Sequence, residues 1–237
     1  MEQTPAHDLP NHDLLSVMPE AARVVEVGCS RGALAKAYKQ RHPNSHILGI
    51  EIDPTFAAAA RSHCDEVRTG NVEELFRNGA LSDLVPAQCW VFGDTLEHLQ
   101  DPWQVLRFAK RLLSPDGCVC ACIPNMQHWS IQLRLNTGKL EYADSGLLDR
   151  THLRWFTRHT MVQLFESCGF QIASLQPRIF PHPHTQKACV VIGQIASQIG
   201  HNPQQAIQDA LPLQYIIKAQ PASTSPATAA PPLPRTD

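Results

Sequence analysis

A run of β-branched residues, a turn of small residues and an alanine-rich stretch follow one another between Val24 and Tyr38. The valines favour a strand that is covered on both faces, and the alanines favour a helix. Gly28, Ser30 and Gly32 lie in the turn, where little side chain separates the backbone from a ligand. Because a helix start presents N–H groups and the positive end of the helix dipole, this turn predicts a site for an anionic or zwitterionic ligand.

The alternation of strand and helix continues through the chain, after a short helix that Asn11 caps and Pro19 ends. Apolar runs predict strands over residues 23–28, 46–52, 66–68, 88–93, 118–123, 170–175 and 213–219. Helical patterns cover residues 31–42, 158–168 and 188–199, and others follow Asp53, Asn71 and Asp101. This order implies an α/β fold, a Rossmann-like, doubly wound, seven-stranded and mostly parallel sheet, whose last strand is antiparallel beside the sixth.

The length of 237 residues fits one domain with elaborations. We assign residues 1–19 to an N-terminal arm and helix, residues 20–220 to the domain, and residues 221–237 to a disordered Pro/Ala-rich tail. Residues 124–157 interrupt the rhythm after the fifth strand. Loops after strands lie at the carboxyl edge of such a sheet, where ligands bind, so this insertion is predicted to form a lid over the substrate.

The composition excludes several classes of protein. A formal net charge of −2 provides no basic field for general nucleic-acid binding, and no apolar run approaches the ~18 residues of a membrane span. The cysteines include no Cys-x-x-Cys pair, which argues against a zinc ribbon. Cys118, Cys120 and Cys122 alternate along one predicted strand, as small core residues on one face would. The polar N-terminus lacks an apolar signal region, so the chain is predicted to be cytoplasmic and reduced.

Three motifs occur together at a characteristic spacing. Glu26-x-Gly28-x-Ser30-x-Gly32 follows the first strand, Gly49-Ile50-Glu51 ends the second, and Asp94-x-Leu96-Glu97-His98-Leu99 follows the fourth. Together they resemble the class I S-adenosylmethionine (SAM)-dependent methyltransferases, closely over residues 20–123 and more weakly to about 220. Ser30 stands where that family usually has a third glycine. The turn by itself would also suit a nicotinamide dinucleotide, but that alternative leaves the third motif unexplained.

The resemblance implies that SAM binds at the turn and at the two following motifs. Glu26 would hold the ammonium region, the Gly28–Gly32 turn would meet the carboxylate, and Glu51 would accept hydrogen bonds from both ribose hydroxyls. The cofactor-binding residues that it implies are Glu26, Gly28, Cys29, Ser30, Gly32, Glu51, Ile52, Asn71, Val72, Asp94 and Leu96. Simpler structural roles compete at some positions, notably helix capping by Asp53 and a turn at Asn71.

The resemblance also places candidate catalytic residues at Glu97, His98 and His152. Some ubiquinone-pathway O-methyltransferases and small-RNA terminal 2′-O-methyltransferases carry an acid-x-x-Glu-His motif and a later histidine. In those proteins the groups bind a divalent cation that lowers the pKa of the acceptor hydroxyl, and Asp94 stands where they have glutamate. A divalent metal at this set, His152 as a metal-free general base, and a structural His152 therefore all remain open.

The acceptor is predicted to be a hydroxyl on a small molecule or a glycan. Residues 124–157 are similar to methyltransferases that accompany glycosyltransferases in bacterial surface-glycan pathways, while a quinone-precursor phenol is the alternative. His128 and Trp129 are candidate acceptor contacts or packed loop residues, and Tyr142, Asp144 and Asp149 could meet a polyhydroxylated acceptor. A cofactor-binding scaffold without catalysis, as part of a glycan-assembly complex, is the alternative from a different class of function. The sequence leaves the oligomeric state open.

Overall fold

A computed structural model describes residues 9–222 of the chain. The strands are β1 (Arg23–Val27), β2 (His46–Glu51), β3 (Glu66–Thr69), β4 (Ala87–Gly93), β5 (Leu113–Pro124), β6 (Phe170–Arg178) and β7 (Gln214–Pro221). The helices are α1 (His12–Val17), α2 (Ala33–Arg41), α3 (Pro54–Ala60), α4 (Val72–Arg77), α5 (Pro102–Arg111), α6 (Trp129–Asn136), α7 (Arg158–Ser167), α8 (Thr185–Gln198) and α9 (Pro203–Ala210). A 3₁₀ turn, η1 (Leu96–His98), follows β4.

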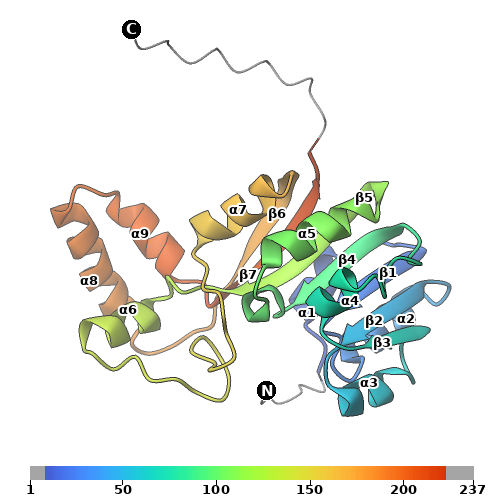
Figure 1. The fold of residues 1–237 in the computed structure, drawn as a ribbon. Helices are drawn as coiled ribbons and strands as arrows, with labels where there is room; N and C mark the ends of the chain where they lie inside the picture. Colours follow the sequence, from blue (N-terminus) through green and yellow to red (C-terminus); the bar gives the residue numbers. More distant parts are fainter. Residues whose placement is uncertain (1–8, 223–237) are drawn as a thin grey trace, which may run out of the picture.

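The strands form one seven-stranded sheet in the order β3-β2-β1-β4-β5-β7-β6 (Figure 1). The first five strands along the chain pair in parallel, while β7 pairs antiparallel with both β5 and β6. The predicted α/β fold, with its mostly parallel seven-stranded sheet and antiparallel last strand, is therefore confirmed. Strands β1 and β4 lie side by side, although β2 and β3 come between them in the sequence. The strand order therefore reverses between β1 and β4. Ligands bind at such a reversal point in folds of this kind.

Asx residues fix the starts of helices α1, α3, α4 and α5. The side chains of Asn11, Asp53, Asn71 and Asp101 each accept a hydrogen bond from a backbone N–H in the first turn that follows. Proline occupies the first helical position after both aspartates, where its missing N–H costs nothing. The expected capping role of Asp53 is therefore confirmed.

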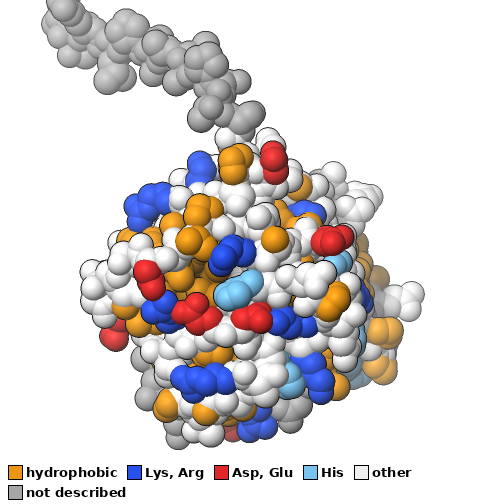
Figure 2. Space-filling model, turned by 90° about the vertical axis from the view of Figure 1, so that its right-hand side faces the viewer, with side chains coloured by type: hydrophobic (Ala, Val, Ile, Leu, Met, Phe, Trp, Pro, Cys, Tyr) orange, Lys and Arg blue, Asp and Glu red, His pale blue; other side chains and the backbone are white. Residues whose placement is uncertain are grey.

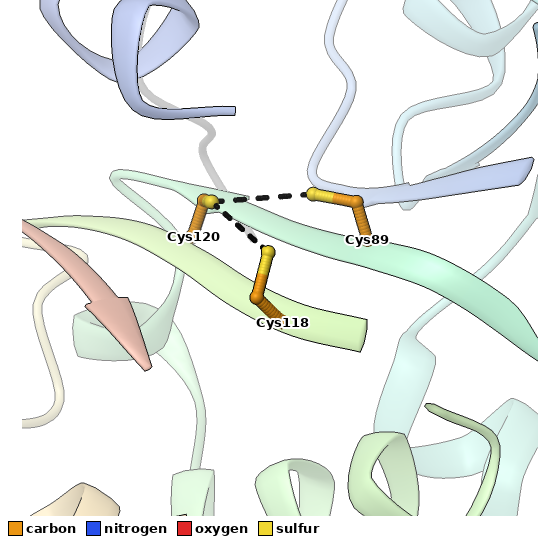
Figure 3. A group of neighbouring side chains, drawn as sticks. All are labelled: Cys89, Cys118 and Cys120. Carbon is orange, nitrogen blue, oxygen red and sulfur yellow. Dashed lines mark hydrogen bonds between the residues drawn. The ribbon is translucent and has the colours of Figure 1, made fainter. Parts of the chain in front are cut away.

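Apolar side chains cover both faces of the sheet. One core contains Trp90, Phe92 and residues of α4, α5 and α7, and the other packs α1 and α2 against the opposite face. Cys118, Cys120 and Cys122 all belong to the second core, as their alternation predicts. Cys120 contacts the Sγ atoms of Cys89 at 4.0 Å and Cys118 at 3.9 Å (Figure 3). These thiols occupy space in the core as small apolar groups do.

Residues outside the β/α rhythm build a small helical unit beside the sheet. Helix α6 packs with α8 and α9 around the buried Trp129, Ile192 and Ala210, and the three helices lie together at one side of the molecule (Figure 1). The predicted helix over 188–199 is confirmed as α8, whereas the sequence pattern does not predict α9. Residues 124–157 thus contribute α6 to this unit and otherwise form the loop that leads to α7. Whether they act as a lid stays a prediction.

Some boundaries differ from the sequence-based ones. Strand β5 begins at Leu113, before the expected turn, because its pairing with β4 shifts register between Ala87 and Cys89 and resumes at Cys118. Strand β7 extends to Pro221, which pairs with Phe170, so the ordered sheet enters the first residue of the predicted tail. The tail over 223–237 and the arm over 1–8 lie outside the described residues.

The surface carries charges of both signs. Figure 2 shows one face of the molecule, on which Lys and Arg side chains are interspersed with Asp and Glu rather than gathered into one basic field. Among residues 9–222, no helix is both long enough and apolar enough to cross a bilayer.

Candidate functional site

The ends of β1, β2 and β4 bring the three sequence motifs to one edge of the sheet. In the parallel register, Val27 on β1 lies beside Ile50 on β2 and Phe92 on β4. The segments that leave these strands therefore start side by side: the small-residue turn after Val27, Glu51 at the end of β2, and Asp94 after β4. Neighbouring parallel strands thus place chemistry from distant parts of the sequence around one point.

The turn after β1 adopts a backbone conformation that favours glycine. Gly28, Ser30 and Gly32 have φ angles of +74°, +48° and +80°, in the left-handed region. A Cβ at Gly28 would lie only 2.6 Å from Oγ1 of Thr95, so a larger residue does not fit there. Thr95 also donates from Oγ1 to the carbonyl oxygen of Val27 at 2.9 Å, which ties the segment after β4 to the end of β1. Close packing between these segments thus explains the glycine at position 28.

Several N–H groups of this turn already have partners within the protein. Gly28 donates to the carbonyl of Ile50 at 2.8 Å, and Ser30 donates to Oε2 of Glu51 at 2.7 Å. The hydroxyl of Ser30 is buried without a hydrogen-bond partner among the described residues. An unsatisfied buried hydroxyl is unfavourable, so Ser30 Oγ is the polar atom of this turn that most needs a ligand.

Glu26 and Glu51 are buried carboxyl groups at the ends of neighbouring strands, with exposed fractions of 7% and 2%. Burial raises the pKa of Glu26 well above its usual range, and the charges of Cys64 and Glu51 raise it further. Glu51 accepts hydrogen bonds from Ser30 N at 2.7 Å and Asp53 N at 2.9 Å, one on each carboxylate oxygen. A carboxylate oxygen accepts more than one hydrogen bond, so a ligand that brings hydroxyl or ammonium donors suits this acidic pair.

The other predicted cofactor residues divide between surface and core. Ile52, directly after β2, is 45% exposed. Its side chain is therefore accessible for packing against the adenine ring of a bound cofactor. Asn71 caps α4 by accepting from Glu73 N at 2.8 Å. Val72 and Leu96 are buried in the core, so their side chains are not accessible to a ligand. Any contact that these two residues make with a ligand must therefore come from their backbone atoms. The roles of all these residues toward a cofactor stay predictions.

A second cluster lies directly beyond Asp94. One ligand atom each from Glu97, His98 and His152 lie within 4.8 Å of one another. Glu97 and His98 come from η1, and His152 comes from the loop before α7. That loop is held in place because the carbonyl oxygen of Glu97 accepts from the N–H groups of Leu153 at 2.8 Å and Arg154 at 2.9 Å. The structure therefore joins two motifs that are more than fifty residues apart.

The ring of His98 is oriented by the same loop. Its Nδ1 lies 3.2 Å from the carbonyl oxygen of Thr151 and 3.0 Å from Thr151 Oγ1. A carbonyl oxygen only accepts, so Nδ1 carries the hydrogen and Nε2 keeps its lone pair. Thr151 is itself held by Oδ1 of the buried Asp149, which accepts from its N–H at 2.8 Å and from its hydroxyl at 2.7 Å. Such a chain of supporting hydrogen bonds is typical of histidines that ligate metals.

Three buried side-chain atoms of Glu97 and His152 have no hydrogen-bond partner among the described residues. Both carboxylate oxygens of Glu97 and Nδ1 of His152 are buried with no such partner among the described residues. Nε2 of His152 lies 4.0 Å from Oε1 of Glu97, which is beyond hydrogen-bond distance. Burial of unsatisfied polar groups is costly, and such groups in a native fold call for a missing ion, water or substrate.

The electrostatics of the cluster follow from this burial. Burial raises the pKa of Glu97 well above its usual range, and the charges of Asp94 and Asp149 raise it further. Burial lowers the pKa of His152 to about 4, and the neighbouring His98 lowers it too, against opposing effects of Asp149 and the Leu147 carbonyl. Burial also lowers the pKa of His98. Both histidines are therefore neutral near pH 7, in the form that binds a metal or accepts a proton.

Asp94 and the candidate acceptor contacts lie outside the cluster of Glu97, His98 and His152. Asp94 has a φ angle of +53° and accepts from the side-chain amide of Gln214, so it is not one of the three clustered groups. His128 caps α6 through Ser130, and Trp129 packs among the helices, so both serve the fold. Tyr142 is 65% exposed.

The remaining acceptor-side candidates are two aspartates. Asp144 pairs with Arg150 at 2.5 Å. Asp149 points to Thr151 rather than to an open surface. These interactions hold the loop together.

Sequence reasoning missed the residues that support the site. Thr95 packs over Gly28, and Thr151 orients His98, yet neither carries a motif of its own. Glu73 accepts from the N–H groups of Gln100 at 3.1 Å and Asp101 at 2.7 Å, which fixes the chain after η1. For Thr95 and Thr151, the only sequence signal for a supporting role is that each stands beside a motif residue. The sequence contains no signal for the contact that Glu73 makes with the chain after η1.

We expect Gly28→Ala to destabilise the fold and to abolish tight cofactor binding. A left-handed backbone at alanine costs about 1–2 kcal/mol, and the clash with Thr95 adds roughly 1–3 kcal/mol more. The matched control is Gly146→Ala, since Gly146 has a φ angle of +85° but a Cβ added there would meet no described atom within 4 Å. Thermal unfolding should show the larger loss of stability for Gly28→Ala. Equal losses of stability in the two variants would mean that the close contact with Thr95 is not the reason for the glycine at position 28.

Solved structures of methyltransferases share this fold. A SAM-dependent methyltransferase of Thermotoga maritima covers 88% of this chain and 86% of its own length, with a TM-score of 0.58 and 18% sequence identity. The plantazolicin methyltransferase, solved with S-adenosylhomocysteine (SAH), covers 87% of this chain and 79% of its own, with a TM-score of 0.56 and 13% identity. The fold is that of the SAM-dependent methyltransferases.

Sequence comparison then gives the family. Residues 6–175 match the family model described as a methyltransferase domain, and the chain belongs to this family of SAM-dependent methyltransferases. The ubiquinone biosynthesis O-methyltransferase of Xanthomonas axonopodis pv. citri is 30% identical over 104 residues, which is 42% of this chain and 41% of that protein. Its counterpart in Acinetobacter baylyi is 26% identical over 102 residues, 41% of each protein. The match thus spans about two fifths of the length of these curated relatives.

Proposed function

We propose that this methyltransferase transfers the methyl group of SAM to a hydroxyl oxygen of a small molecule or glycan. The observation that carries the proposal is the trio of the buried Glu97 and His152 and the half-buried His98, placed directly after the strand end that faces the cofactor turn. Transfer to an oxygen requires removal of a proton, and these groups suit that requirement. The matched relatives named as O-methyltransferases support the same reaction type.

In this proposal the acidic pair and the turn hold the cofactor. Glu51 accepts from the ribose hydroxyls, and Glu26 faces the ammonium group, whose positive charge would stabilise the ionised form of this buried carboxyl. Ser30 Oγ gains a partner from the amino-acid end of the ligand. SAM supplies a methyl group on a positively charged sulfur, so the protein needs chiefly to align the acceptor oxygen with it.

The trio would handle the proton of the acceptor hydroxyl. Its mixed set of one carboxylate and two imidazoles fits a divalent cation, because both oxygens of Glu97 and Nδ1 of His152 lack other partners among the described residues, and His98 directs Nε2 away from Thr151. A divalent cation bound there would lower the pKa of an acceptor hydroxyl. His152, neutral at pH 7, is also competent to take the proton directly as a general base.

Cation binding at the trio is a prediction with its own measurement. We expect calorimetric titration with Mn²⁺ or Zn²⁺ to show one saturable site, whose affinity falls about 10–100-fold in Glu97→Gln because a ligand is lost. The affinity should rise with pH, since the raised pKa of Glu97 means that a proton must leave before the cation binds. Glu74→Gln, at an exposed position on α4, is the matched control. If the cation shows no saturable binding, or if Glu97→Gln binds it equally well, the trio does not bind a cation. His152 would then remain the only candidate for the proton acceptor.

Titration of the reduced protein with SAH tests the cofactor half of the proposal. We expect saturable binding with one site per chain. If SAH does not bind at high micromolar concentration, the assignment of the Gly28–Gly32 turn to the cofactor is wrong. The acceptor half requires identification of the methylated product, by transfer of a labelled methyl group into extract fractions of lipid, glycan and small-molecule character.

A further inference from the structure

Two cysteine thiols from distant parts of the sequence meet beside the cofactor turn. Cys29 lies inside the turn, between Gly28 and Ser30, and Cys64 follows α3. A Cβ at Gly49, on β2 between them, would lie 2.6 Å from Sγ of Cys29 and 3.2 Å from Sγ of Cys64. Both sulfur atoms therefore occupy the space that a side chain at position 49 would fill.

The glycine at position 49 is explained by these sulfurs and not by its backbone. Gly49 does not have a positive φ angle, and a glycine inside a strand is unfavourable by roughly 0.5–1 kcal/mol relative to alanine. Its backbone therefore does not require glycine. The two sulfurs do, because any side chain there would displace them.

The environment of the two thiols differs in a way that suits successive reaction. The interaction with Cys29 lowers the pKa of Cys64, and nearby Lys39 also lowers it, against the effects of burial and Asp65. The same interaction raises the pKa of Cys29, and burial adds to this. Cys64 is 7% exposed and Cys29 2%. Of the two, Cys64 is thus the more acidic thiol and belongs to the less buried residue, as the first thiol to react would.

We propose that Cys29 and Cys64 are a redox-sensitive pair whose disulfide weakens cofactor binding, and the second part of this proposal rests on the proposed function. A hydroperoxide is the oxidant. The Cys64 thiolate attacks one peroxide oxygen, so that an S–O bond forms, the O–O bond breaks, and the second oxygen leaves and takes up a proton. The Cys29 sulfur then attacks the oxidised Cys64 sulfur, an S–S bond forms, and the S–O bond breaks to release water after Cys29 loses its proton.

The link to the cofactor runs through the backbone of the turn. The residue after Cys29 is Ser30, whose N–H donates to Oε2 of Glu51, the predicted ribose acceptor. A disulfide holds its sulfur atoms about 2.05 Å apart, much closer than thiols in contact. Movement of Cys29 toward Cys64 would pull Ser30 with it and disturb the Glu51 carboxylate. By reciprocity, a ligand that holds the turn in place should slow formation of the disulfide.

A second group of neighbouring thiols in the same chain tests whether closeness alone is enough for a disulfide to form. Cys120 lies 4.0 Å from Cys89 and 3.9 Å from Cys118 (Figure 3). These three thiols are at most 2% exposed, and they share one apolar core with Cys29 and with Cys64, which is 7% exposed. If closeness alone governed oxidation, these thiols would cross-link as readily as Cys29 and Cys64. The proposal predicts that they do not, because none of the three residues is as exposed as Cys64.

The test is controlled oxidation of the reduced full chain with hydrogen peroxide, followed by peptide mapping without reduction and by SAH titration. We expect a peptide that joins Cys29 to Cys64, a fall of at least about tenfold in SAH affinity, and recovery of both after treatment with dithiothreitol. Saturating SAH should slow the cross-link. Cys64→Ser, or Cys64→Ala if the serine variant is unstable, should keep its affinity through the same treatment, while Cys168→Ser should behave like the unaltered protein.

The outcomes separate the pair from the cofactor assignment. Absence of the Cys29–Cys64 peptide, or equal cross-linking among Cys89, Cys118 and Cys120, overturns the redox pair. A cross-link that leaves SAH affinity unchanged overturns its effect on the site. If the reduced protein fails to bind SAH, the cofactor assignment is wrong, whereas the peptide map still decides whether the redox pair exists.

Discussion

His152→Ala is expected to lower the rate of methyl transfer by about 10²–10⁴-fold, the usual contribution of a positioned proton acceptor or ligand. The imidazole side chain is 6% exposed, and its Nε2 lies 4.0 Å from Oε1 of Glu97. It makes no hydrogen bond from Nδ1 within the described part of the chain. The rate would be measured on whichever extract fraction the unaltered protein labels, with SAH affinity measured alongside.

The matched control for this variant is His159→Ala, at an exposed position in the first turn of α7. It removes the same side chain without touching the trio and should keep full activity. The pH profile adds an independent readout. Because burial lowers the pKa of His152 to about 4, its neutral form persists down to that pH, and activity that depends on it should fall only as the pH approaches 4. Full turnover by His152→Ala would mean that His152 is structural.

Glu51→Ala should weaken SAH binding by about 1–3 kcal/mol, since a charged hydrogen-bond acceptor is lost. That loss corresponds to roughly 5–150-fold in the dissociation constant. The carboxylate also accepts from Ser30 N and Asp53 N, so part of the effect will come through the position of the turn. Glu51→Gln keeps one acceptor oxygen and the volume of the side chain, and we expect it to lose less affinity than the alanine variant.

Glu66→Ala is the control for Glu51→Ala. Glu66 lies on the neighbouring strand β3 and pairs with Arg68 at 2.6 Å, away from the turn. Its removal should leave SAH affinity unchanged. Equal affinity of the Glu51→Ala variant and the unaltered protein, with both shown to be folded by thermal unfolding, would place the ribose contact elsewhere.

Local signals in the sequence predict most of the fold. The Asp53-Pro54 and Asp101-Pro102 pairs each mark a helix start, because the aspartate caps the first turn and proline fits its first position. Asn202-Pro203 is the same signal, and α9 begins there, yet the pattern after it does not predict a helix. The sequence that follows this cap is mostly polar, and its apolar face is limited to Pro203, Ala206, Ile207 and Ala210, a short pattern for identifying a helix. Packing against α8 supplies the stability that local propensity does not.

Prediction of the site extends only as far as the motifs. Glu26 and Glu51 converge because their strands are parallel neighbours, which the alternation of strands and helices already implies. The approach of His152 to Glu97 and His98 depends on how one loop folds back on η1, through the carbonyl oxygen of Glu97. No periodicity or spacing encodes that contact, and only the resemblance to a family indicates it. The packing of α6 on α8 and α9 is likewise a tertiary contact that local patterns do not specify.

The most direct test of the central claim is transfer of a labelled methyl group from SAM to an acceptor in cell extract, followed by identification of the methylated atom. The proposed site predicts that the label appears on a hydroxyl oxygen and that a protein carrying both Glu97→Gln and His152→Ala fails to place it there. A label on nitrogen or carbon, or equal labelling by the double variant, would contradict the assignment of the Glu97, His98 and His152 trio to proton removal.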